Sequence, residues 1–180
     1  RLHSINGEFD KAIEAFDFAL TCDNSDDELK ILKAYCHYMN ENYEKAIELY
    51  QEMKWTEEVR PRVIPLLAEC YVKIEEYEKA YHLLKEQMNQ NFYPEDSSTY
   101  INHIRCCVEL GKEKEASETL FKAVKQFPNN VRLLSLLALS YSENGQEEKA
   151  IEITEQLFNV LDQTAEKKDT ISPDEFLSLI

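Results

Sequence analysis

Five alanines recur along the chain at nearly constant spacing, and this periodicity constrains the fold more than any other feature. The spacings are 34, 34, 36 and 34 residues between Ala12, Ala46, Ala80, Ala116 and Ala150. Four of the five follow a lysine, and a large residue stands four positions after each of the first four. A fixed period of this length indicates stacked copies of one supersecondary unit.

Each unit is predicted to contain two antiparallel helices. In the third unit, apolar residues recur at three- and four-residue spacing, first over 64–71 and then over 77–84, which is the helical period. A glycine or an acidic residue stands at the turn between the two helices, and all five prolines are expected between units or at a helix start. With only three glycines, a fold rich in strands and turns is excluded.

These features resemble the tetratricopeptide repeat (TPR) family, in which a small residue, a polar turn, an alanine and a large apolar residue recur every 34 residues. Pro128 matches the closing proline of that family. The resemblance covers residues 1–161 and implies an all-α fold, an α-solenoid in which the helix pairs form a right-handed superhelix. It also implies a concave groove that is lined by the first helix of each unit.

Both ends of the repeat array are expected to be incomplete. The first unit has a full second helix but only the tail of a first helix, with its turn at Gly7. Residues 162–172 are predicted to be a polar connection. Residues 173–180 are predicted to start a further helix, because Ser172 can cap it and Pro173 suits its first position. The two extra residues of the fourth unit are expected in the loop over 89–96. We therefore expect the chain to be a fragment of a longer protein.

Composition limits the classes of partner. Asp and Glu number 35 against 20 Lys and Arg, a formal net charge of −15, whereas nucleic acids and anionic membranes bind basic surfaces. No apolar stretch is long enough for membrane insertion. The cysteines are odd in number at five, which favours a reducing, cytoplasmic location over a disulfide scaffold.

No residue pattern predicts catalysis, a cofactor or a metal. Cys36, Cys70 and Cys106 each lie ten residues before the alanine of their unit, so they are equivalent sites on successive helices. Their expected separation of about 10 Å is too large for one zinc ion. We interpret them as small packed residues. There is no nucleophile motif and no phosphate-binding loop, so we predict that the chain is not an enzyme.

The groove-facing residues follow from the helical angle of about 100° per residue. Six positions of each first helix fall on one face, at 18, 15, 14, 11, 8 and 7 residues before the alanine. From these positions the predicted partner-binding set combines apolar and basic residues: Ile31, Tyr35, Tyr38, Arg62, Leu66, Lys73, Asn102, Arg105 and Arg132.

The set suggests a peptide with an apolar anchor at one end and an acidic portion at the other. The alternative is that the arginines pair within the groove with Glu69, Glu109 and Glu143.

Three hypotheses for function follow. The first is a non-catalytic scaffold that binds a protein segment in its groove within a larger intracellular complex. The second is a docking or regulatory arm of an enzyme whose catalytic domain lies outside this sequence. The third is a structural module that self-associates through the ends of its repeat array.

Overall fold

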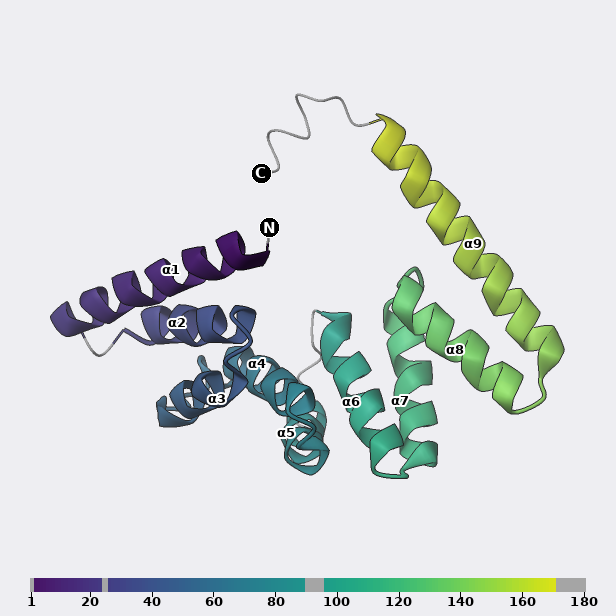
Figure 1. Ribbon diagram of the computed structural model, residues 1–180. Helices are drawn as coiled ribbons and strands as arrows, with labels where there is room; N and C mark the ends of the chain where they lie inside the picture. The colour runs from purple at the N-terminus through teal and green to yellow at the C-terminus, as the bar shows by residue number, and fades with distance from the viewer. Residues whose placement is uncertain (1, 24–25, 90–95, 171–180) are drawn as a thin grey trace. The chain divides into compact units, whose positions relative to one another are not determined.

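The computed structural model describes residues 2–23, 26–89 and 96–170, and all regular structure in these ranges is α-helical. In chain order the helices are α1 (Leu2–Cys22), α2 (Asp27–Met39), α3 (Tyr43–Glu52), α4 (Arg60–Lys73), α5 (Tyr77–Asn89), α6 (Ser97–Glu109), α7 (Glu113–Gln126), α8 (Val131–Glu143) and α9 (Glu147–Thr170) (Figure 1). Among the described residues, no helix combines the length and apolarity that crossing a bilayer requires.

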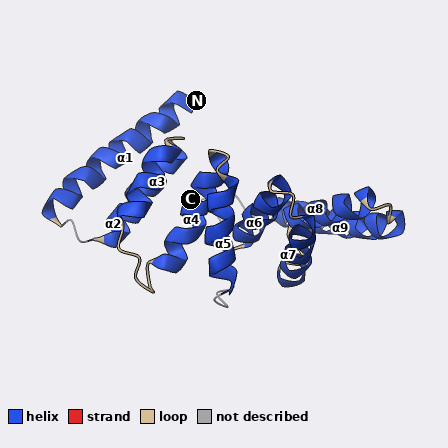
Figure 2. Ribbon diagram, turned by 90° about the horizontal axis from the view of Figure 1, so that it is seen from below, coloured by secondary structure: helices blue, strands red, loops and turns tan. Residues whose placement is uncertain are grey.

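The chain forms two compact units, each larger than one helix pair, that divide between Lys112 and Glu113. From here on, "unit" means one of these two parts, and a single helix pair is called a repeat. The first unit contains α1 to α6. In it, α2 packs on α3 and α4 packs on α5, while α3 and α5 also contact the next first helix, α4 and α6 respectively. Figure 2 shows α1 to α5 lying side by side. In the second unit, α8 packs against both α7 and α9. Paired helices, as the period predicts, are therefore present within each unit.

The turn that ends each first helix contains one residue in the left-handed conformation. The four equivalent residues have φ values of 60 to 68°: Glu41, Glu75, Gly111 and Gly145. At the end of α2, the Asn42 N–H donates to the His37 carbonyl at 2.9 Å, and the Glu41 N–H donates to the Tyr38 carbonyl at 3.0 Å. The same two bonds recur at the other three turns. This is the Schellman motif, and it explains why glycine stands at this place in two of the four turns.

Glycine at the two strained turns should stabilise the protein. An L-residue in the left-handed region costs about 1 kcal/mol or more, and glycine avoids this cost. We expect Glu41→Gly and Glu75→Gly each to raise the free energy of unfolding by about 0.5 kcal/mol, and Gly145→Ala to lower it by about 1 kcal/mol. Urea denaturation measures the difference.

The control is Glu48→Gly, which places glycine inside α3 and should cost about 1 kcal/mol. If Glu41→Gly destabilised the protein as much as Glu48→Gly, the turn would carry no strain.

Small residues are buried on both helices of each pair in the first unit. Ala34 and Ala46 have no exposed surface in the pair of α2 and α3, and Ala68 and Ala80 have none in the pair of α4 and α5. Small side chains on facing helices let the helix axes approach closely. The space around them is filled by large buried side chains, including Tyr50, Ile64, Leu67 and Leu84. The recurring alanine is thus a packing residue of the core.

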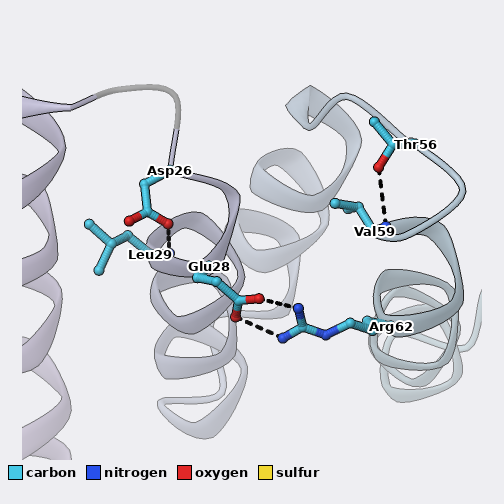
Figure 3. A network of polar contacts seen from close by, with 6 residues as sticks. All are labelled: Asp26, Glu28, Leu29, Thr56, Val59 and Arg62. Atoms are coloured by element: carbon cyan, nitrogen blue, oxygen red, sulfur yellow. Dashed lines mark hydrogen bonds and ion pairs between the residues drawn. The ribbon is translucent and has the colours of Figure 1, made fainter.

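Most described first helices start at a side-chain cap 20 residues before the alanine. At α2, the Asp26 carboxylate accepts from the Leu29 N–H at 3.1 Å, and the same place holds Asp96 and Asn130 before α6 and α8. Arg60 occupies this place in the third repeat. There, the hydroxyl of Thr56 accepts from the Val59 N–H at 3.2 Å (Figure 3). The N-cap residue of α4 therefore has no side-chain cap, and the Thr56 hydrogen bond closes the turn that precedes the helix.

Pro65 lies inside α4, so the prediction that every proline starts a helix or separates units was wrong for this residue. Helix α4 starts at Arg60, so Pro65 lies beyond its first turn. Proline has no N–H, so the Pro61 carbonyl four residues earlier loses its helical donor. The side-chain amide of buried Gln87 on α5 donates to this carbonyl at 3.2 Å. The second helix of the pair therefore supplies the missing hydrogen bond.

This compensation predicts an energetic coupling between Gln87 and Pro65. We expect Gln87→Met to lower the free energy of unfolding by about 1 kcal/mol or more, because it leaves the Pro61 carbonyl unpaired. In a Pro65→Ala background the restored N–H satisfies that carbonyl, so the same substitution should cost less. Urea denaturation of the four variants gives the coupling energy. An equal cost in both backgrounds would contradict the account.

Two helix boundaries differ from the sequence prediction. Gly7 lies within α1, which is one continuous helix from Leu2 to Cys22. The predicted connection over 162–172 is helical as far as Thr170, since no proline or glycine interrupts it before Pro173. The predicted helix over 173–180 lies outside the described residues, as do residues 90–95 of the predicted loop.

Candidate functional site

The accessible surface of the first helices follows a four-position pattern. Residues that lie 18, 14, 11 and 7 positions before the alanine share one side of the helix, and none of them is buried. In the first unit these residues are Glu28, Leu32, Tyr35 and Met39 of α2, Arg62, Leu66, Glu69 and Lys73 of α4, and Ser98, Asn102, Arg105 and Glu109 of α6. We call them the first-helix face. The helix α4 contacts both α2 and α6.

The other two predicted positions, 15 and 8 residues before the alanine, include buried residues in α2 and α4. Ile31 is only 6% exposed and Val72 only 2%. The structure therefore buries Ile31, whereas the prediction placed it on the accessible groove. Its side chain lies about 40° around the helix from Tyr35, which directs it into the core.

After Glu28, the α2 row of the first-helix face is apolar. Leu32 is 45% exposed, and Tyr35 and Met39 are each 40% exposed. Their spacing of three and four residues makes one continuous stripe. The ring of Tyr35 stacks on the ring of Tyr38, with centroids 5.9 Å apart. Three large apolar side chains on one helix are thus available to a partner.

Tyr38 connects α2 to α4. Its hydroxyl donates to a Glu69 carboxylate oxygen at 2.8 Å. Burial, with the nearby Glu69 carboxylate, raises the pKa of Tyr38, so the phenol stays protonated and donates. Half-buried Tyr38 therefore positions the face rather than offering a free aromatic surface.

Arg62 is already paired within the face. Its guanidinium donates through both terminal nitrogens to the Glu28 carboxylate, with Nη2 to Oε2 at 2.7 Å (Figure 3). The hydrogen bond from Arg62 lowers the pKa of the Glu28 carboxyl. The predicted internal pairing of this arginine exists, but its partner is Glu28 and none of the three glutamates named for it. Arg62 is therefore not a free cation for an acidic ligand.

Lys73 and Arg105 remain accessible. Lys73 is exposed and makes no ion pair with any residue that the structure describes. The Arg105 guanidinium lies over the Tyr77 ring, 5.7 Å from its centroid, and Nη2 donates to the Tyr77 hydroxyl at 3.3 Å. A guanidinium has five N–H donors, so this contact leaves others for a partner. Leu66 and Asn102 lie half-buried on the same helices.

Arg132 belongs to the second unit. It is exposed at the corresponding place on α8. The same pattern continues along that helix with Leu136, Leu139 and Glu143. The predicted set therefore divides between the two units.

Burial disfavours the thiolate form of Cys70 and Cys106. Burial raises the pKa of the Cys70 thiol to about 12 and that of the Cys106 thiol to about 11. Both side chains are fully buried, while Cys22 is exposed. The Cys107 sulfur lies 3.6 Å from Nδ1 of His103, a packed contact within α6. The interpretation of Cys70 and Cys106 as packing residues agrees with their burial.

Thiol titration should separate these classes. We expect Ellman's reagent to modify Cys22 rapidly in the native protein, and Cys70 and Cys106 only when the chain unfolds, because a buried protonated thiol is unreactive. In a Cys22→Ser variant the fast phase should disappear. A fast phase that persists at Cys70, shown by its loss in Cys70→Ala, would contradict this burial.

Comparison with protein families identifies the repeat. A family model described as anaphase-promoting complex, cyclosome, subunit 3 matches residues 5–87 and 60–123, and a tetratricopeptide repeat model matches residues 119–152. The chain belongs to the tetratricopeptide repeat family. The two models together match nearly all of the TPR array predicted over residues 1–161. No curated protein sequence matches the chain.

Solved structures show the same fold. MamA aligns with a TM-score of 0.76 at 18% identity, covering 89% of this chain and 92% of that one. A MamA structure from Desulfovibrio magneticus RS-1 aligns with a TM-score of 0.72 at 15% identity, covering 87% and 88%. YrrB, described as a TPR protein with an unusual peptide-binding site, aligns with a TM-score of 0.63 at 20% identity, covering 88% and 81%. The predicted all-α solenoid is confirmed.

Proposed function

We propose that this TPR chain is an interaction scaffold whose first-helix face binds a segment of another protein. The observation that carries the proposal is the exposed apolar row of Leu32, Tyr35 and Met39 on α2. Large exposed apolar patches beside polar groups are typical of protein-binding surfaces. The TPR family supports this class of function, since the similar structure of YrrB is described as having a peptide-binding site.

The chemistry of the face specifies the segment. An apolar side chain of the partner would pack against the α2 row. An acidic group would reach Lys73 or Arg105, which are exposed on α4 and α6. Arg62 contributes little to this recognition because Glu28 already occupies its guanidinium. The partner segment therefore combines an apolar anchor with an acidic portion.

The scaffold is proposed to act without catalysis, inside a cell and within a larger assembly. The high pKa values of Cys70 and Cys106 argue against thiol nucleophiles there. Neither unpaired buried cysteines nor an exposed Cys22 is typical of a secreted disulfide framework. The family model of an anaphase-promoting complex subunit supports a place in an assembly. Chain charge of −15 disfavours nucleic acid as the partner.

Selection from a random peptide library on the native chain tests the proposal. We expect the selected peptides to share an apolar residue separated from Asp or Glu. Binding measured by fluorescence anisotropy should weaken about tenfold or more in the double variant Tyr35→Ser, Met39→Ser, because the apolar contact area is lost. In Lys73→Glu, Arg105→Glu it should weaken most for the acidic peptides.

The control variant is Phe18→Ser, which removes an equally large side chain that is 74% exposed on α1. Its affinity should equal that of the native chain. Peptides that bind the Tyr35→Ser, Met39→Ser variant as tightly as the native chain would show that another surface is the binding site.

A further inference from the structure

A second apolar surface lies in the second unit, independent of the first-helix face of the first unit. A cleft of about 460 Å³ between α8 and α9 is lined by Ala138, Leu139, Ser142, Ala150, Ile151, Thr154, Glu155 and Phe158. Within it, Leu139 is 55%, Ile151 60% and Phe158 61% exposed. Three large apolar side chains therefore converge on one open surface of this unit.

The repeat shows which shape of ligand this cleft fits. The residues equivalent to Ile151 are Ile47 on α3 and Tyr81 on α5, and they are only 8% and 4% exposed. They are covered because a following first helix, α4 or α6, packs on α3 or α5. For example, the Tyr81 ring stacks on the His103 ring of α6 with centroids 5.5 Å apart. The cleft on α8 and α9 thus corresponds to the surface that a packed α-helix covers on α3 and α5.

The rim of this cleft differs in charge from the equivalent surfaces of α3 and α5. Glu155 stands where α3 and α5 have Gln51 and Lys85. At the start of α9, Glu147 stands where α3 and α5 have tyrosines, as Glu113 does at the start of α7. Both glutamates lie within about 40° of Ile151 around the helix, so they flank the apolar stripe.

The carboxylates at the rim are not neutralised. Glu147 and Glu155 are exposed, and neither makes an ion pair with a residue in the described part of the chain. The nearby Lys149 is turned elsewhere, since its ammonium donates to the side chain of Gln146 at 2.8 Å and lies over the Tyr141 ring. An apolar cleft with unpaired acidic groups at its edge complements a helix that has basic flanks.

We propose that the α8–α9 cleft docks a basic amphipathic α-helix of a partner protein. The apolar side of that helix packs on Leu139, Ile151 and Phe158. Its lysines and arginines pair with Glu147 and Glu155 at the rim. This site is distinct in place and in charge preference from the first-helix face, so one scaffold would hold two different protein segments.

A designed peptide of about 18 residues tests the proposal, with leucine at helical spacing and lysine elsewhere. Fluorescence anisotropy with the full chain should show saturable binding. The variant Ile151→Ser, Phe158→Ser should weaken binding about tenfold or more. Glu147→Gln, Glu155→Gln should weaken it about fivefold at low ionic strength and much less at high salt.

Matched controls separate this site from general attraction to an acidic chain. The variants Phe18→Ser and Glu14→Gln, Glu118→Gln remove an exposed aromatic and two exposed carboxylates elsewhere, and they should bind as the native chain does. A scrambled peptide of the same composition lacks the apolar side and should bind at least tenfold more weakly. Equal binding of the scrambled peptide, or of a peptide with glutamate in place of lysine, would overturn the proposal.

Two other occupants give different results. If light scattering showed a dimer that Ile151→Ser, Phe158→Ser abolishes, the occupant would be a second copy of the chain. If truncation after Thr170 increased peptide affinity tenfold or more, the occupant would be residues 171–180 of the same chain. Either result would overturn the proposal of a partner helix.

Discussion

The left-handed residue that ends each described first helix is the constraint on which the rest of the structure depends. It allows the chain to reverse within two or three residues, closed by two backbone hydrogen bonds. In the pairs of α2 with α3 and of α4 with α5, such a reversal places the second helix beside the first, so the two helices pack together. The small buried residues on both helices then follow as a packing requirement.

This geometry also decides which side of each first helix is accessible. In α2 and α4, the residues that face the partner helix and the neighbouring pair are buried, and a stripe of four positions stays open. The backbone arrangement is the same in successive pairs, so differences in chemistry come from the side chains in the stripe. The α2 row is apolar after Glu28 and the α4 row is charged, which gives one face two kinds of contact. Function in this fold therefore resides in residues that the repeat itself does not require.

Much of the architecture could be predicted because its causes are local and periodic. The 34-residue spacing predicts paired helices, and the helical angle places Tyr35, Lys73 and Arg105 on an accessible side. The partners of the charged residues could not be predicted. Arg62 pairs with Glu28 on the neighbouring helix, and the hydrogen bond of Tyr38 to Glu69 also joins two helices. Such pairs depend on interhelical distances that a single sequence does not contain.

Errors in the prediction arose where local rules met tertiary packing. Pro65 is tolerated inside α4 because Gln87 on α5 bonds the carbonyl that proline leaves unpaired. Ile31 satisfies the angular criterion for the groove, yet it lies in the core at the side of the stripe. The exposed cleft of α8 and α9 became recognisable only when equivalent residues could be compared for burial. In the sequence, Glu147 and Glu155 do not differ from other surface glutamates. Only the structure shows that they lie beside an exposed apolar cleft.

Site-specific photo-crosslinking tests the central claim, that the first-helix face is the surface that binds a protein segment. A photoreactive amino acid would replace Tyr35 in one chain and Phe18 in another, and each would be irradiated with a peptide that binds the native protein. The account predicts a crosslink from position 35 and none from position 18, although Phe18 is the more exposed of the two. A crosslink from position 18, or none from position 35 while the peptide remains bound, would contradict it.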